Sequence, residues 1–186
     1  MHIEKADIYF LVDGSSNIKH NDFLEMKVFM NEVIKMFRIG PDRVRFGVVQ
    51  YSDRINSQFI LSQYSSVAEL KVAIDGIQQR GGGTMTGLAL GSMAQVFVNT
   101  ARSNVPWYLI VITGGKSEDP VAEPADALRA EGVIIYAIGI KNANDNELKE
   151  IAKDKMFFAA EFDSLKAIQQ DVVQDICSSE CKNFFP

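Results

Sequence analysis

The chain has 186 residues and a mass of 20.7 kDa, the size of one ordinary domain. Hydrophobic residues make up 47% and charged residues 23% of it, a balance that excludes disordered and collagen-like chains. Its 19 basic and 24 acidic side chains give a net charge of −5, so we expect neither nucleic acid nor an anionic membrane as a main partner. No apolar run approaches the roughly 20 residues that a membrane helix needs, so we expect no membrane insertion.

The first third of the chain predicts a strand, a helix and a hairpin. A short apolar run, Ala6–Val12, predicts a strand buried on both faces, and it ends at a cluster of turn formers, residues 13–17. Apolar residues at helical spacing over 23–37 then predict an amphipathic helix. Residues 44–51 and 57–61 predict two strands with no helix between them. They should therefore form an antiparallel hairpin at an edge of the sheet.

The rest of the chain alternates in the same way. Helices are expected over 67–77, 84–97, 121–130, 146–153 and 165–176, and strands over 107–113, 133–140 and 156–159. The glycine run 81–83 predicts a tight turn, because it lacks the Gly-Lys-Ser/Thr sequence of a phosphate loop. This alternation predicts an α/β fold: an open, mostly parallel sheet with one antiparallel edge strand and helices on both faces.

Polar residues follow the first predicted strand where it leaves the sheet. Asp13 and Ser15 supply a carboxylate and a hydroxyl, and oxygen ligands suit Mg²⁺. The same residue types form turns and helix caps, which is the favoured interpretation of this segment alone. Ligands of open α/β sheets bind at the carboxyl ends of the strands. The loops after Val12, around Thr84 and after Thr113 are therefore the candidates for a site.

Four segments occur in order along the chain: DIYFLVDGSSNI, VRFGVVQYSD, GGGTMTGLAL and WYLIVITGGKSEDP. Through them the chain resembles a von Willebrand factor type A domain from about Ala6 to Ile176. Within this family it is most similar to the N-terminal A domains of the collagen VI alpha-3 chain. The resemblance implies a Rossmann-like sheet that carries a metal-ion-dependent adhesion site, in a secreted protein of the extracellular matrix. We expect an N-terminal tail over 1–5, the domain over 6–177 and a C-terminal tail or interdomain linker over 178–186.

Only some of the metal-ligand positions of this family carry the same residue type in this chain. The family pattern is Asp-x-Ser-x-Ser in the first loop, a Thr in the second and an Asp after the fourth strand. Asp13, Ser15 and Thr84 match, Asn17 replaces the third ligand, and Gly114 stands where the family has Asp. A unit charge about 5 Å from a divalent cation interacts with it by roughly 6 to 7 kcal/mol, before desolvation is subtracted. We therefore expect a vestigial site, no resident cofactor and at most weak Mg²⁺ binding.

Two alternatives to this metal-free interpretation stay open. Asp119 or Glu118 could substitute for the missing carboxylate, and Asp13, Ser15 and Thr84 would then support metal-dependent adhesion. A magnesium-dependent hydrolase or phosphoryl-transfer enzyme would need a second carboxylate or a base beside Asp13. The sequence has Gly114 at that place, so we expect no enzyme.

The resemblance implies binding partners, and the cysteines bear on how the domain is joined to others. The partners would be extracellular matrix or cell-surface proteins and sister A domains of the same chain, at the face of the Asp13, Thr84 and Gly114 loops or, without metal, at helix faces. Cys177 and Cys181 could bridge each other, pair with a neighbouring module or stay reduced. In a secreted protein we expect a disulfide within the tail or to an adjacent domain.

Overall fold

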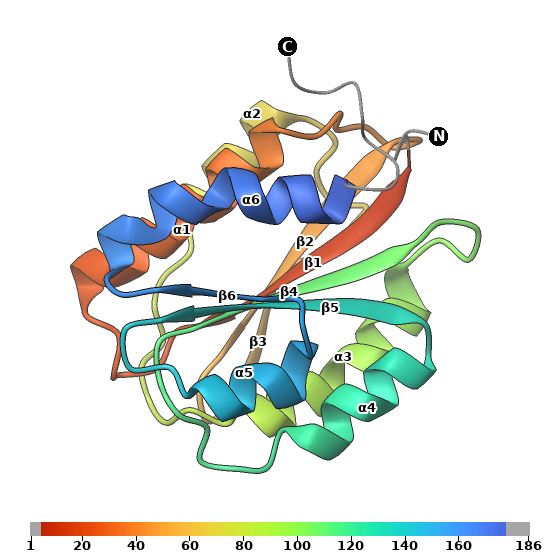
Figure 1. Ribbon diagram of the computed structural model, residues 1–186. Helices are drawn as coiled ribbons and strands as arrows, with labels where there is room; N and C mark the ends of the chain where they lie inside the picture. Colours follow the sequence, from red (N-terminus) through yellow and green to blue (C-terminus); the bar gives the residue numbers. More distant parts are fainter. Residues whose placement is uncertain (1–4, 178–186) are drawn as a thin grey trace.

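The computed structural model describes residues 5–177, and its six strands form one sheet in the order β3-β2-β1-β4-β5-β6. Only β3 among them runs antiparallel to its neighbour. The strands are β1 (Ala6–Asp13), β2 (Val44–Tyr51), β3 (Ile55–Phe59), β4 (Trp107–Thr113), β5 (Val133–Ile140) and β6 (Met156–Ala159). The predicted α/β fold with an antiparallel edge strand is confirmed (Figure 1).

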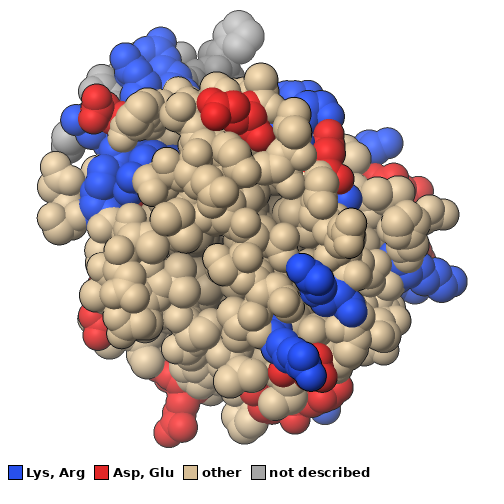
Figure 2. Space-filling view, turned by 180° about the vertical axis from the view of Figure 1, so that it is seen from behind, with Lys and Arg blue, Asp and Glu red and all other residues tan. Residues whose placement is uncertain are grey.

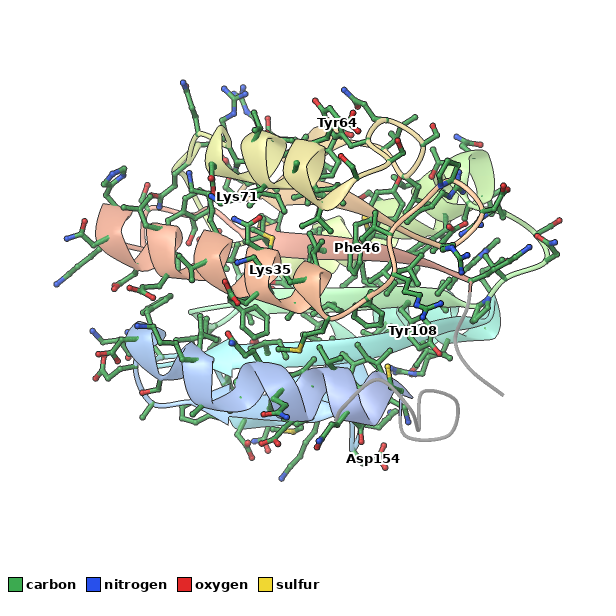
Figure 3. All side chains as sticks on the ribbon, turned by 90° about the horizontal axis from the view of Figure 1, so that it is seen from above. Lys35, Phe46, Tyr64, Lys71, Tyr108 and Asp154 are labelled. Carbon is green, nitrogen blue, oxygen red and sulfur yellow. The ribbon has the colours of Figure 1, made fainter. Side chains whose placement is uncertain are left out.

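Helices cover both faces of the sheet. One layer holds α1 (His20–Lys35), α2 (Val67–Asp75) and α6 (Leu165–Cys177), and the other holds α3 (Thr86–Thr100), α4 (Ala122–Ala130) and α5 (Asp145–Ala152). A short 3-10 helix, η1 (Phe162–Ser164), precedes α6. Figure 3 shows α2, α1 and α6 side by side, with Phe46 of β2 beneath them. None of the helices within residues 5–177 is long and apolar enough to cross a membrane.

The central strand β1 shows why the strands appear in the sequence as continuous apolar runs. All eight of its residues are buried. Ile8 and Phe10 pack toward the α1 layer, whereas Tyr9 and Leu11 pack toward the α3 layer. Because a parallel strand between two helix layers has no solvent face, polar residues do not alternate along it.

The predicted bounds are confirmed for β2, β4, β5 and β6, but β3 begins two residues earlier than expected. It covers Ile55–Phe59 instead of 57–61. The turn before it is very tight, because the Ser52 N–H donates to the Arg54 carbonyl at 3.0 Å. The chain therefore pairs with β2 directly after Arg54, and Ile55 lies opposite Tyr51.

The start of α3 also differs from the prediction, which placed it at Thr84. The helix begins at Thr86. Thr84 is held outside the helix by Glu118: the Thr84 N–H donates to Glu118 Oε1 at 3.2 Å, and the Thr84 carbonyl accepts from the Glu118 N–H at 2.8 Å. These contacts join two loops that are far apart in sequence, so no local pattern reveals them.

A buried ion cluster lies at the amino-terminal end of β1. The fully buried Asp7 carboxylate accepts from Arg45 Nε and Nη2 of β2, at 2.9 Å each. It also accepts from the Arg102 backbone N–H at 2.6 Å and from Arg102 Nη2 at 2.7 Å. Burial by itself would raise the pKa of Asp7, but the two arginines outweigh it and hold the pKa below the ordinary value. The cluster fixes the segment after α3 to the start of β1.

Candidate functional site

Three loops meet where β1 and β4 leave the sheet, at the opposite end from the ion cluster. Asp13 ends β1, Thr84 lies between α2 and α3, and Gly114 follows β4. The Gly114 N–H donates to Asp13 Oδ2 at 3.3 Å, and Asn17 Nδ2 donates to Thr84 Oγ1 at 3.4 Å. The structure thus brings the expected residues together. We call Asp13, Ser15, Asn17, Thr84 and Gly114 the rim.

Asp13 is fully buried, and hydrogen bonds from the protein occupy both of its carboxylate oxygens. Oδ1 accepts from the Ser15 N–H at 2.9 Å, and Oδ2 accepts from the Thr113 hydroxyl at 3.1 Å as well as from Gly114. No Lys or Arg within residues 5–177 forms a salt bridge with it. Burial raises the pKa of Asp13, and the hydrogen bonds lower it without cancelling that effect.

The other polar rim residues offer hydroxyls and an amide. Ser15 Oγ is buried and has no hydrogen-bond partner among the described residues. Thr84 is fully buried, whereas Asn17 is exposed and directs its NH₂ group at the Thr84 hydroxyl. Of these groups, Ser15 Oγ is the one placed as a ligand atom would be, because it is buried and unsatisfied.

Apolar side chains fill the space beside Gly114. A β-carbon at this position would lie 2.5 Å from Ile18 Cδ1 and 2.9 Å from Phe162 Cζ. Ile18 comes from the loop between β1 and α1, Phe162 comes from η1, and both are buried. Neither residue was among the site residues predicted from the sequence. An apolar residue within the polar loop was a signal for Ile18, but nothing in the local pattern marks Phe162.

The two candidate replacement carboxylates have different positions. Asp119 accepts from the Gly87 and Leu88 N–H groups, at 2.7 Å each, and so caps the amino end of α3. Glu118 contacts the rim directly through the backbone of Thr84. The structure therefore brings Glu118, and not Asp119, next to a rim residue.

The rim loops are held in place by hydrogen bonds from the segment before α3. Gln79 Nε2 donates to the carbonyls of Ser15 and Ile18, at 3.0 and 2.7 Å. Gly81 and Gly82 have φ angles of 74° and 97°, a conformation that glycine adopts without strain. The chain bends at Gly82 instead of forming the predicted tight turn, because its backbone bonds to the first loop: the Gly81 N–H donates to the Gly14 carbonyl, and the Gly82 carbonyl accepts from the Ser16 N–H. The Gln79 hydrogen bonds help to fix the shape of the first loop.

Cys177 is buried at the end of α6. Cys181 lies outside the described residues. The expected disulfide of these two cysteines therefore stays a prediction.

A sequence profile of the von Willebrand factor type A domain matches residues 7–171. The collagen alpha-4(VI) chain of Mus musculus is 69% identical over 97% of this chain, which spans only 8% of that protein. The collagen alpha-5(VI) chain of Homo sapiens is 48% identical over 95% of this chain, or 7% of its own length. Matrilin-4 of Mus musculus is 32% identical over 94% of this chain and 30% of its own length.

These relatives are secreted proteins of the extracellular matrix, as the resemblance implies. The similarity to collagen VI is confirmed. The predicted greater similarity to the alpha-3 chain is not confirmed. The similar collagen VI chains are alpha-4, alpha-5 and alpha-6.

Solved structures show the same fold. Proximal thread matrix protein 1 from the mussel byssus superimposes with a TM-score of 0.86 at 35% identity, over 94% of this chain and 46% of that one. That structure has a "zinc occupied MIDAS motif". The manganese-loaded TRAP protein of Plasmodium vivax has a TM-score of 0.76 at 19% identity, over 92% of this chain and 75% of that one, which shows the fold alone.

Proposed function

Because the chain belongs to the von Willebrand factor type A family, we propose that it is a protein-binding module of the extracellular matrix whose rim works without a divalent cation. The module comprises residues 6–177, with 1–5 and 178–186 as flanking segments. Its partners are matrix or cell-surface proteins and sister A domains. Since the chain spans less than a tenth of its collagen relatives, the proposal concerns this domain and not a whole protein.

The filled space at Gly114 is the observation that carries the metal-free part of the proposal. Ile18 and Phe162 lie where an aspartate side chain at position 114 would begin. With glycine at this position, Asp13 is the one carboxylate among the rim residues. Its oxygens already accept three hydrogen bonds, and Asn17 turns its NH₂ group toward Thr84. The unsatisfied Ser15 Oγ fits a ligand position, but one occupied carboxylate and neutral groups do not fit a firmly held divalent cation.

The same geometry supports a binding role over an enzymatic one. Backbone N–H groups and the Thr113 hydroxyl donate hydrogen bonds to the Asp13 carboxylate, and the Ser15 hydroxyl also lowers its pKa; none of these groups is a general base at neutral pH. Among residues 5–177, no group of three His, Cys, Asp or Glu side chains is placed to hold a metal ion. A hydrolase or phosphoryl-transfer enzyme would need one of these arrangements.

Thermal unfolding with and without cations tests the proposal. We expect the melting temperature to change by less than about 1 °C between EDTA and 1 mM Mg²⁺, Mn²⁺ or Zn²⁺. A site with a Kd of about 10 µM would add roughly 2.7 kcal/mol at 1 mM cation. That would raise the melting temperature by about 5 to 10 °C. Such a rise, if Ser15→Ala and Thr84→Val abolish it, would show that the rim binds metal.

The contact between Glu118 and Thr84 favours a second candidate function, metal-dependent adhesion with Glu118 as the replacement carboxylate. This alternative predicts a cation-dependent rise in melting temperature that Glu118→Gln abolishes. Glu123→Gln, an exposed carboxylate in the first turn of α4, is the matched control and should keep the rise. A rise that survives Glu118→Gln would exclude this candidate.

A further inference from the structure

Two stretches of the chain contain no Lys, Arg, Asp or Glu. They are Ile55–Ala68 and Gly81–Ala101, of 14 and 21 residues. At the average content of 23% charged residues, about eight charges would be expected in them. Their complete absence from a chain with a net charge of −5 is a clear bias in how the charges are distributed.

The structure brings parts of these stretches together at the β3 edge of the sheet. Ile55 and Leu61 pack into the same core cluster as Met93 and Phe97 of α3, whereas Phe59 packs into the opposite layer. Figure 2 shows a broad area of uncharged side chains, with a few Lys or Arg side chains on its lower right part and further charged side chains around it. We call the exposed residues of 55–68 and of α3 the neutral face. Its large apolar side chains with at least a third of their surface exposed are Ile60, Leu88 and Val98.

The neutral face contains one edge of the sheet. β3 ends the strand order, so one side of its backbone has no neighbouring strand among the described residues. Its sequence, INSQF, has no charge and no proline. Edge strands are usually guarded by such residues, because free N–H and C=O groups bind other strands. The opposite edge strand, β6, also lacks charge and proline within MFFA, and a basic residue directly precedes each edge strand: Arg54 before β3 and Lys155 before β6.

We propose that the neutral face binds a second copy of this chain, with β3 pairing antiparallel to β3 of the other copy. Antiparallel pairing of identical strands generates a two-fold axis, so both copies use the same surface and the contact closes. Charge favours this partner. Two molecules that each carry −5 repel one another overall, and a face without charges is where they can meet without placing like charges in contact.

The size of the neutral face sets the expected strength of the contact. The 15 residues of α3 extend about 22 Å, and α3 together with the adjacent edge strand covers a width of roughly 20 Å. A footprint of about 450 Å² per copy is smaller than the roughly 800 Å² that a stable interface buries on each partner. We therefore expect weak association, with a Kd on the order of 100 µM, that gains strength where several copies are held close together.

This inference rests on the proposed binding role and deepens it, but it does not depend on the cation. Sedimentation of the 186-residue chain from 10 µM to 1 mM, in EDTA and a reducing agent, tests it. The apparent mass should rise from 20.7 kDa toward twice that value. The association should strengthen from 0.05 to 0.5 M salt, because screening weakens the overall repulsion.

Two lysine variants locate the contact. Ser57 is the central residue of β3, so Ser57→Lys places like charges near each other across the two-fold axis and should raise the Kd at least tenfold. Phe158→Lys, at an exposed position of the other edge strand, should leave the Kd unchanged. Circular dichroism melts establish that both variants fold.

Two results would overturn the proposal: a mass of 20.7 kDa at every concentration, or equal Kd values for the two variants. Either result would leave the cation measurements on the rim unaffected, so the two proposals fail separately.

Discussion

Two buried aspartates lie at opposite ends of the same strand, and their surroundings differ. Asp7, the second residue of β1, lies between two arginines, whereas Asp13, its last residue, lies among backbone N–H groups and a hydroxyl. Both are fully buried. The pKa of Asp7 is nevertheless lowered and that of Asp13 is raised. Burial is common to both sites, so the neighbouring cations decide the direction.

This difference separates a structural site from one with a possible binding role. The Asp7 charge is compensated within the chain, which makes it a fixed tie between β1, β2 and the segment after α3. The Asp13 charge has hydrogen bonds but no cation from the chain. In the family that this chain belongs to, a metal ion supplies that charge. In this chain Gly114 stands where the family pattern has an aspartate, which is why we propose that the rim works without a cation.

The largest loss of stability is expected from removing the Asp7 carboxylate, whose charge the two arginines compensate. Asp7→Ala leaves the Arg45 and Arg102 side chains, 13% and 20% exposed, without their carboxylate. We expect the free energy of unfolding to fall by about 3 to 5 kcal/mol, measured by urea denaturation. Asp126→Ala removes the exposed pair with Arg129 and serves as the control, with a loss below about 1 kcal/mol. Equal losses would mean that burial of the ion cluster contributes nothing.

Adding a second carboxylate beside Asp13, which has no cation from the chain next to it, should cause the next largest loss of stability. Gly114→Asp drives a side chain into Ile18 and Phe162 and places a second carboxylate near Asp13. We expect a loss of about 2 to 4 kcal/mol that 1 mM Mg²⁺ does not reverse, measured by thermal unfolding. The double variant with Ile18→Ala should be less affected by the aspartate. If Mg²⁺ fully stabilises the single variant, the space beside Gly114 is open to a ligand.

The two aspartates should also give stability opposite dependences on pH. Because the pKa of Asp7 is lower in the folded state, its contribution is complete above the ordinary value of about 4 and is lost as the pH falls. The pKa of Asp13 is higher in the folded state, so its contribution is present below the ordinary value and is lost as the pH rises from there through the raised pKa. Urea midpoints from pH 3 to 7 should show the advantage of wild type over Asp7→Asn growing with pH. The stability of wild type relative to Asp13→Asn should instead decrease as the pH rises. The same trend for both variants would contradict the opposite pKa shifts of the two aspartates.

The smallest expected effect lies at the end of the sheet that holds Asp7, in the turn before β6. Lys153 has φ 59° and ψ −118°, and the Lys155 N–H donates to the Ala152 carbonyl at 3.0 Å. This is a type II′ turn, which favours glycine at that position. Lys153→Gly should raise the free energy of unfolding by about 1 kcal/mol. Lys153→Ala keeps the backbone strain and should not raise the free energy of unfolding. If both variants raise it, the cause is removal of the lysine side chain and not relief of strain.

Local patterns account for the parts of the fold that were predicted well. β4 and β5 are predicted to the residue because both are apolar runs between helix layers, bounded by turn formers. The same reasoning fails at Lys153, where lysine occupies a turn position that favours glycine. It also misplaces β3, because a tight turn and pairing with β2 set where that strand begins.

The amino-acid sequence by itself determined the alternation of strands and helices, the family and the glycine at 114, where the family pattern has an aspartate. These depend on the order of residue types along the chain, which is a local property. Only the tertiary structure decided that Ile18 and Phe162 occupy the space beside Gly114, that two arginines compensate Asp7, and that parts of two uncharged stretches meet at the β3 edge of the sheet. The physical reason is that side chains distant in sequence meet only when the sheet brings their elements together.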